Sequence, residues 1–329
     1  MTLSRKETIG WLLLPVLLFS VIVFSLCAGS LWINPIELFT QDDLKNSLID
    51  LRLIRCATAF IIGGGLAVSG TAYQAVLKNP LAEPYILGIS GGASLGVALA
   101  ILLGVAAISS FAIPLFAFVF ALIALVVVLS ISRGGLGGVY SENILLSGII
   151  IGTICSSCLM FIISNLGSND LNSITWWMLG YLQAADMNLL ATTWIVTIGG
   201  TIILVAYGRH ANVIALGEEM AYNMGISPLK TALILLGIAS LISAVAVSLS
   251  GIIGFVGLIV PHIMRQIFGA DHRKLFVLNL FYGGIFLLFC DTIARSILVV
   301  QEIPVGVITA FVGGPFFIWM LNRRGRING

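Results

Sequence analysis

The chain has 329 residues, of which 59% are hydrophobic and only 9% are charged, and its formal net charge is +2. Soluble globular chains carry about 25% charged residues. With a mean hydropathy of +1.11, the composition excludes a soluble protein and predicts a polytopic membrane protein.

Ten stretches are apolar enough to cross a bilayer, for which a helix needs about 20 residues. The eighth stretch, 252–268, is short and contains Pro261-His262, so we expect it to be broken or partly re-entrant. The whole chain, 1–329, is therefore predicted to be one all-α transmembrane domain. The ten stretches are 11–31, 56–76, 86–104, 111–132, 144–164, 189–207, 230–249, 252–268, 276–298 and 305–321.

The first stretch follows "SRKE" and could be mistaken for a signal peptide. It is too long for that, and no A-x-A cleavage site follows it, so we expect it to be retained in the membrane. Trp11 and Trp32 would then lie near the two interfaces.

The positive charges predict the orientation, because Lys and Arg favour cytoplasmic loops. With both termini in the cytoplasm, most of the 16 Lys and Arg residues fall on that side. The exceptions on the outer side are Lys45, Arg52, Arg55 and Arg295. We therefore expect a multi-pass membrane protein with both termini in the cytoplasm.

Two polar connections have a character of their own. In the cytoplasmic loop 208–229, Gly217 precedes Glu218-Glu219, and acids suit a helix N-terminus. Gly225 ends the short helix. Exposed methionines and a tyrosine on it favour docking of a cytosolic protein, although an ordinary interfacial loop is the alternative. On the outer side, 165–187 mixes polar residues with Trp and Tyr and is predicted to be an interfacial segment with a short helix.

The stretch "KNPLAEPYILGISGGASLG" (78–96) resembles a phosphate-binding loop but lacks the GxxxxGK[ST] pattern. Its glycines at 88, 92 and 96 instead favour close helix packing. Pro80 and Pro84 restrict the residues before them, which predicts a rigid cytoplasmic turn over 78–84.

Other reactive residues do not form an enzyme or metal site in the sequence. The CxxC motif Cys155–Cys158 lies within an apolar run, without a second pair, and is read as packing. His262 has no second ligand at metal-binding spacing. We therefore expect no catalytic residue and no metal site.

Charges near the membrane leave two questions open. Asp291 and Arg295 are four residues apart and can pair on one helix face. They are either a self-neutralising pair or a functional site. Arg52 and Arg55 on the outer side either meet an acidic partner or snorkel to lipid headgroups.

Together these features resemble the permease subunits of type II ABC importers for iron–siderophore complexes, haem and cobalamin. The resemblance covers essentially the whole chain. It is carried by "SLCAG" with "WINPIELF" (25–39), "RLIRCATAFIIGGGLAVSGTAYQAVLKNPLAEPYILGISGGASLG" (52–96), "LLSGIIIG" (145–152), "WWMLG" (176–180), "IALGEEMAYNMGI" (214–226), "SGIIGFVGLIVPHIMR" (250–265) and "EIPVGVITAFVGGPFFIWML" (302–321).

The resemblance implies a ten-helix subunit that works as a homodimer in the lipid bilayer of the bacterial inner membrane. Its further partners would be two cytoplasmic ATPase subunits and one outer substrate-binding protein, with no nucleic acid. The chain itself would hold no cofactor, because ATP and Mg²⁺ would be bound by the ATPase subunits.

The resemblance also assigns roles to residues. The ATPase-coupling residues would be Leu216, Gly217, Glu218, Glu219, Met220 and Gly225. Docking of the binding protein would involve Arg52, Arg55 and Arg295. The translocation pathway and its gates would include Ser141, Glu142, Asn143 and Ser147 on the inner side, and Asn165, Ser168 and Asn169 on the outer side. The loop "SRGGLGGVYSEN" before the fifth span departs from the family pattern.

Two alternatives remain at this stage. The same architecture could import an oxyanion such as molybdate. A secondary transporter would be a different class and would need an ion site in mid-membrane, for which Asp291 is the only acidic candidate.

Overall fold

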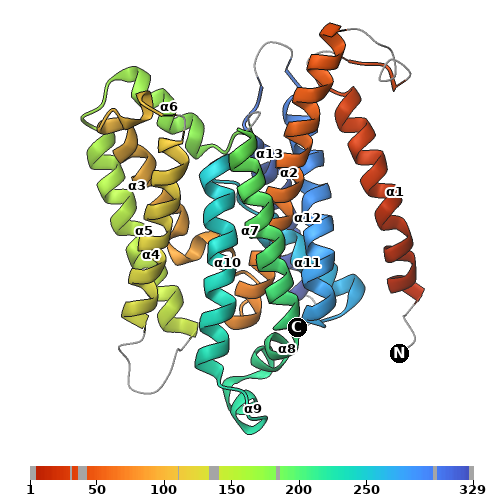
Figure 1. Ribbon diagram of the computed structural model, residues 1–329. Coiled ribbons are helices and arrows are strands. Elements are labelled where there is room, and N and C mark those ends of the chain that lie inside the picture. The colour runs from red at the N-terminus through yellow and green to blue at the C-terminus, as the bar shows by residue number, and fades with distance from the viewer. Residues whose placement is uncertain are drawn as a thin grey trace.

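In the computed structural model the described residues are 5–29, 32–35, 43–109, 111–132, 141–182, 186–298 and 302–325. Over these ranges the chain is helical and has no β-strand (Figure 1). The α-helices are α1 (Arg5–Cys27), α2 (Asp43–Val76), α3 (Ile89–Leu102), α4 (Ala112–Ser132), α5 (Ser141–Ile163), α6 (Ser168–Met178), α7 (Met187–Ala206), α8 (Gly208–Leu216), α9 (Glu218–Asn223), α10 (Pro228–Ser250), α11 (Val256–Phe268), α12 (His272–Ala294) and α13 (Val305–Gly325). Two 3₁₀ turns, η2 (Pro84–Leu87) and η3 (Val105–Ala107), flank α3.

Each of the ten predicted apolar stretches coincides with one helix, which confirms the all-α membrane fold. Seven helices are long and apolar enough to cross a membrane, and three shorter apolar helices lie at Ile89–Leu102, Val256–Phe268 and Val305–Met320. The number of complete crossings stays a prediction. The eighth stretch is interrupted, but the interruption expected at Pro261-His262 is wrong, because α11 runs from Val256 to Phe268 with Pro261 inside it. The non-helical residues are instead 251–255, just before α11.

The helices form an upright bundle whose two ends differ. In Figure 1, α1 begins and α13 ends at the end where α8 and α9 project, and α6 lies at the opposite end. We call these the inner end and the outer end. The interfacial helix predicted within 165–187 is α6, and the short helix predicted in the loop 208–229 is α9. The helix α8 before it was not predicted.

The centre of the bundle consists of α2, α10 and α12. In each of these helices 67% of the residues in the apolar membrane-spanning part are buried, against 6% for α1. Glycines allow these backbones to touch. A Cβ on Gly63 of α2 would lie 2.3 Å from the carbonyl oxygen of Gly283 in α12. A Cβ on Gly70 would lie only 1.9 Å from the carbonyl oxygen of Gly257 in α11. Small residues that let helices approach closely are a common packing device in membranes.

The glycine-rich stretch after Lys78 packs helices as predicted, because Gly92 and Gly96 face the backbone of α4 at Phe120 and Phe116. The predicted cytoplasmic turn is only partly correct. Lys78 is exposed, but Ala82 and Pro84 are buried. Figure 1 shows the chain rising from the inner end of α2 to about half the height of the bundle, where α3 begins.

Replacing Gly70 tests the close contact between α2 and α11. We expect Gly70→Ala to lower the free energy of unfolding by at least about 2 kcal/mol, because the two backbones must separate to admit a methyl group. The measurement is the melting temperature of the detergent-solubilised protein.

The matched control is Gly237→Ala in α10, where a new Cβ meets nothing within 4 Å. Alanine is the better helix former by about 1 kcal/mol, so this variant should be as stable as the parent or more so. Equal melting temperatures for both variants would contradict the tight packing at Gly70.

Candidate functional site

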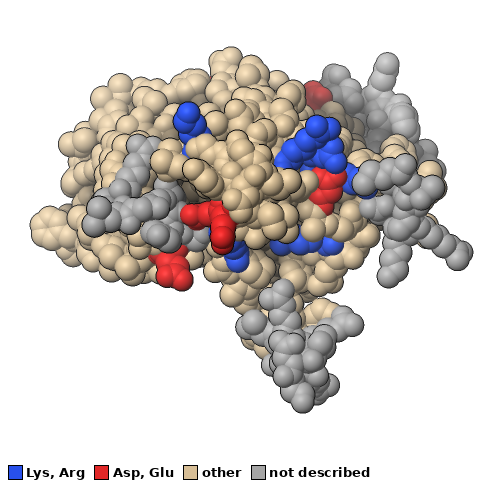
Figure 2. All heavy atoms as spheres, turned by 90° about the horizontal axis from the view of Figure 1, so that it is seen from below, with Lys and Arg blue, Asp and Glu red and all other residues tan. Residues whose placement is uncertain are grey.

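The candidate residues gather in three places, which are the projecting inner end, the outer end of α2 and α12, and one face of α5. Each is built by a different part of the chain. The inner end carries basic side chains in the short helix α8 and in the end turns of α10, α11 and α12, namely Arg209, Lys230, Arg265, Arg273 and Lys274. Figure 2, which looks at this end, shows small groups of basic side chains, some with acidic side chains directly beside them, among mostly uncharged residues.

Helix α8 is fixed to the start of α12 by a polar cluster around Asp271. The side-chain amide of Asn212 donates to Asp271 Oδ1 at 2.9 Å, and the backbone N–H of His272 donates to Asn212 Oδ1 at 2.8 Å. Asp271 caps α12 and pairs with Arg273 at 3.0 Å. These hydrogen bonds, from Arg273 first, lower the pKa of Asp271 to about 2. The stabilisation by the carboxylate is therefore lost only as the pH falls through about 2.

Helix α9 projects furthest and is bounded by two glycines in conformations that favour glycine. Gly217 has a φ of 134° and Gly225 a φ of 74°. Ala221 is buried against the bundle, whereas Leu216, Met220 and Tyr222 are 71%, 49% and 76% exposed. Of the predicted coupling acids, Glu218 lies 3.9 Å from the ammonium group of Lys78 and Glu219 is exposed. A short helix with an exposed apolar face and acids at its start is suited to docking of another protein.

At the outer end, the three predicted docking arginines lie together but turn inward. Arg52 and Arg295 are 8% and 4% exposed. Arg52 donates to the carbonyl oxygens of Leu26 and Cys27 at the end of α1. Arg295 donates to the backbone and side-chain oxygens of Ser25. The arginines therefore connect α1, α2 and α12.

Asp291 lies between two of these arginines. Arg55 donates to both carboxylate oxygens of Asp291 at 2.9–3.1 Å, and the predicted pair of Asp291 with Arg295 is present at 3.6 Å. Arg55 also pairs with Glu302 at 2.8 Å, and Tyr181 donates to the same Glu302 oxygen at 3.0 Å. We call Arg52, Arg55, Asp291, Arg295 and Glu302 the outer cluster.

The outer cluster borders a hollow of about 240 Å³. Its wall contains the three arginines and Glu302, and its rim contains Leu48 and Leu51 of α2. Neither Glu302 nor Tyr181 was predicted to belong to this site. Whether a partner docks at the arginines stays a prediction, because the hydrogen bonds and ion pairs described above are internal.

The predicted gate residues separate to the two ends of α5. Ser141 begins the helix, Glu142 is exposed, Asn143 is half-buried and Ser147 is buried. Past the other end of α5, Asn165, Ser168 and Asn169 are exposed.

Between these ends, Gly148, Gly152, Thr153 and Ser156 line a hollow of about 520 Å³. Its wall also contains Asn79 and Tyr85 from the connection between α2 and α3, which sequence reasoning missed. The hydroxyl groups of Thr153 and Ser156 donate to carbonyl groups of their own helix. Their exposed surface is therefore weakly polar.

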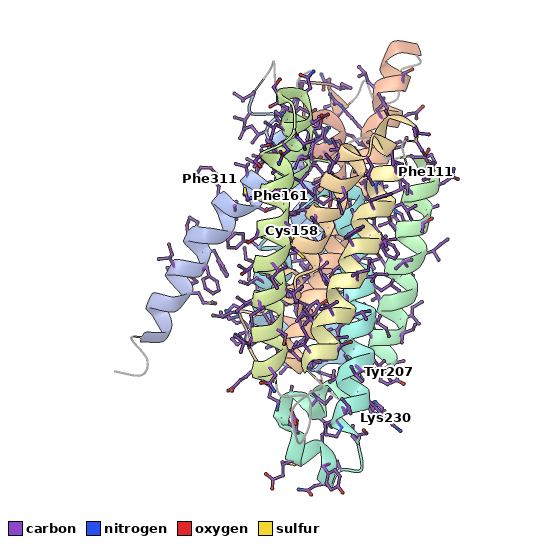
Figure 3. All side chains as sticks on the ribbon, turned by 90° about the vertical axis from the view of Figure 1, so that its left-hand side faces the viewer. Phe111, Cys158, Phe161, Tyr207, Lys230 and Phe311 are labelled. Atoms are coloured by element: carbon purple, nitrogen blue, oxygen red, sulfur yellow. The ribbon has the colours of Figure 1, made fainter. Side chains whose placement is uncertain are left out.

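On the side of the bundle that carries this face, α5 and α13 both expose large apolar side chains. Figure 3 shows Cys158 and Phe161 of α5 and Phe311 of α13 on that side, with α13 leaning away, and Phe111 on the opposite side. Phe161 and Phe311 are 73% and 75% exposed. Cys155 and Cys158 are not bonded to each other. Among the described residues, no three His, Cys, Asp or Glu side chains are placed to hold a metal ion.

Comparisons with known proteins agree over nearly the full length. A family profile described as "FecCD transport family" matches residues 16–323. The "Vitamin B12 import system permease protein BtuC" of Escherichia coli (strain SE11) and that of Shigella flexneri are each 36% identical to this chain. Both alignments cover 99% of this chain and 100% of the relative.

Solved structures agree with the fold. A structure described as an inward-facing conformation of a metal-chelate type ABC transporter matches with a TM-score of 0.84 and 28% identity, over 94% of this chain and 97% of that one. PsaBC from Streptococcus pneumoniae in complex with Fab matches with a TM-score of 0.55 and 16% identity, over 82% and 90% of the two chains. The second likeness concerns the fold alone.

The outer cluster makes a prediction about stability. Asp291→Asn leaves the buried guanidinium groups of Arg55 and Arg295 without the carboxylate that they share. Removing one partner of a buried ion pair is expected to cost about 3 kcal/mol or more. Glu302→Gln is the matched control at a site 34% exposed, where the loss should be under about 1 kcal/mol.

The measurement that compares the stability of the two variants is their melting temperature in detergent. A clear ordering, with Asp291→Asn much less stable than Glu302→Gln, is the expected result. Similar melting temperatures would mean that Asp291 does not hold the outer cluster together.

Proposed function

The chain belongs to the FecCD transport family and is an ABC importer permease of the metal-chelate and cobalamin type, and on that premise we propose how it works. Two copies form a pathway that an outer binding protein loads and that two ATPase subunits drive. The observation that carries this proposal is α9, an exposed short helix at the inner end of the membrane bundle. The sequence of the chain has no phosphate-binding loop of its own. Energy must then reach the chain through a partner.

The inner end supplies the contact for the ATPase subunits. Leu216, Met220 and Tyr222 offer apolar surface, and Glu218 and Glu219 offer charge that fixes the orientation of the partner. Because Asn212 and Asp271 tie α8 to α12, a force on α9 acts on the long helices rather than on a free loop. Closure of the ATPase pair would thus rock the two permease copies against each other.

The pathway is proposed to lie between the two copies, along the face where α5 lines the hollow of about 520 Å³ and where Phe161 and Phe311 are exposed. A large chelate crossing this face would meet glycines and hydroxyl groups that are already bonded within α5. Such contacts are weak, so the substrate can leave again as the pathway opens alternately to each side. The predicted gate residues at the two ends of α5 would then close the pathway alternately on one side and on the other.

The binding protein is proposed to dock at the outer end. Its acidic side chains would approach the hollow bordered by Arg52, Arg55 and Arg295, because opposite charges steer and orient encounter. The internal partners of these arginines hold the guanidinium groups in place before the binding protein arrives. Such preorganisation reduces the ordering that docking must impose.

The proposed substrate is a metal chelate of the size of cobalamin, since vitamin B12 permeases align with 99% of this chain. An iron–siderophore complex or haem would suit the same weakly polar pathway. An ion-coupled secondary transporter is not supported by the site, because Asp291 is already paired with Arg55 and Arg295.

Uptake in proteoliposomes tests the proposed function. With the cognate ATPase and binding protein, cobalamin uptake should require ATP, and Glu218→Lys with Glu219→Lys should reduce uptake by about tenfold, equivalent to about 1.4 kcal/mol of lost coupling. Co-purification of the ATPase should weaken in parallel.

The control is Asp170→Lys, which reverses one acidic charge on the exposed surface of α6 at the outer end. It should leave ATPase co-purification unchanged. Uptake driven by an ion gradient without ATP would refute the importer mechanism, and normal coupling in the double variant would refute the role of α9.

Docking at the outer hollow is tested on its rim, which spares the buried arginines. Leu51 is 51% exposed. Leu51→Glu should weaken stimulation of ATP hydrolysis by the loaded binding protein, whereas Leu51→Lys should strengthen it, because the approaching surface is proposed to be acidic.

The control is Leu53, which is 45% exposed on the same helix and does not line the hollow. Leu53→Glu should leave stimulation unchanged. The apparent affinity is read from titrations of the binding protein at two salt concentrations, since attraction between charges weakens with salt. The same response to Glu and Lys at position 51 would rule out acidic docking at this site.

A further inference from the structure

The connection between α2 and α3, residues 77–88, joins the inner end to the interior of the bundle. It begins beside α9, where the ammonium group of Lys78 lies 3.9 Å from Glu218. It ends at Gly88, the residue before α3, with Ala82 and Leu87 fully buried. The segment is internally braced, because Asn79 Oδ1 accepts a hydrogen bond from the backbone N–H of Leu81 at 2.9 Å.

A second interruption lies against this segment. Between α10 and α11 the chain is unwound at 251–255, and Gly251 and Phe255 both have a φ of 69°. A residue other than glycine in this conformation is held there at a cost of about 1–3 kcal/mol. Unwound backbone inside a bundle also leaves N–H and C=O groups without helical partners, each costing several kcal/mol if unsatisfied.

Segment 77–88 supplies partners for this unwound backbone. The hydroxyl group of Tyr85 donates to the carbonyl oxygen of Ile253 at 2.8 Å and accepts from the N–H of Ile253 at 2.9 Å. One side chain thus satisfies both backbone groups of a residue that is 1% exposed. Glu83 Oε2 accepts from the N–H of Phe255 at 3.2 Å. Its carboxylate lies at the start of α11, where the helix dipole favours negative charge.

Steric contacts hold the same junction. A Cβ on Gly257, in the first turn of α11, would lie 2.9 Å from the ring of Pro84 and 2.7 Å from the carbonyl oxygen of Leu66. The break also touches α13, because a Cβ on Gly313 of α13 would lie 2.4 Å from the ring of Phe255. The unwound residues are therefore clamped between segment 77–88 and α13.

We propose that Tyr85 and Glu83 are positioning residues that lock the α10–α11 break to segment 77–88 and so pass movement from α9 to α11 and α13. This inference rests on the proposed function, in which α9 receives the ATPase. The link is short and made of directed hydrogen bonds to backbone, so a shift of the segment shifts the start of α11 with it. Loss of the link would leave ATP hydrolysis possible but less able to open the pathway.

The test uses the assembled importer in proteoliposomes, with ATP hydrolysis and cobalamin uptake measured on the same samples. Tyr85→Phe keeps the ring and removes only the hydroxyl group. Hydrolysis should continue, while uptake per ATP hydrolysed falls by about fivefold or more, the lower end of coupling between sites. Glu83→Leu should act in the same direction, and Glu83→Gln, which keeps an acceptor oxygen for Phe255, should retain most of the uptake.

Tyr282→Phe is the matched control, because the hydroxyl group of Tyr282 makes one hydrogen bond of 2.9 Å to the carbonyl oxygen of Gly10, away from the break. It should leave uptake per ATP unchanged. If Tyr85→Phe and Tyr282→Phe give the same ratio as the parent, the positioning role is overturned.

Hydrogen exchange of the permease in nanodiscs gives a readout that does not depend on transport. In Tyr85→Phe, amides of 251–258 should exchange faster, while those of α4 keep their protection. Unchanged exchange at 251–258 would overturn the clamp even if uptake falls. If the parent complex shows no ATP-dependent uptake, the proposed function fails, and the exchange experiment still decides whether the clamp exists.

Discussion

The lack of water inside a bilayer is the constraint on which this structure depends. Unwound backbone is stable there only where protein groups satisfy it. The chain breaks its helices before α3 and before α11, and the two breaks meet, so that Tyr85 and Glu83 from one satisfy Ile253 and Phe255 of the other. The unwound backbone of the second break is therefore satisfied by side chains of the first.

Close backbone contact is the second requirement, and it explains why glycines concentrate where α2 meets its neighbours. Apolar side chains gain little by leaving lipid for protein, so tight packing must hold membrane helices together. The contacts of Gly63 with Gly283 and of Gly70 with Gly257 place α2 directly on α12 and α11. A side chain at Gly63 would separate α2, which carries Arg55, from α12, which carries Asp291, and a side chain at Gly70 would separate α2 from α11.

The sequence predicted those features that depend on neighbouring residues. Apolar stretches of about 20 residues located the long helices, and Gly217 and Gly225 located the two ends of α9. Helix α8 and the outer extension of α2 were missed because they are polar or amphipathic and carry no membrane signal. In the outer cluster only the pair Asp291–Arg295 could be foreseen, since it is four residues apart. The contacts of Arg55 join residues 236 and 247 positions away, which no local pattern encodes.

The two proposed docking sites act on one rigid element. Helix α2 carries Arg52 and Arg55 near its outer end, and segment 77–88 follows directly from its inner end. Its 34 residues span roughly 50 Å at about 1.5 Å per residue. Since glycine contacts press α2 against α11 and α12, it cannot bend independently of the core. A force applied at the outer cluster and a force applied at α9 therefore both act on α2. Binding of the outer protein and closure of the ATPase pair can then influence each other through a helix that moves as a unit.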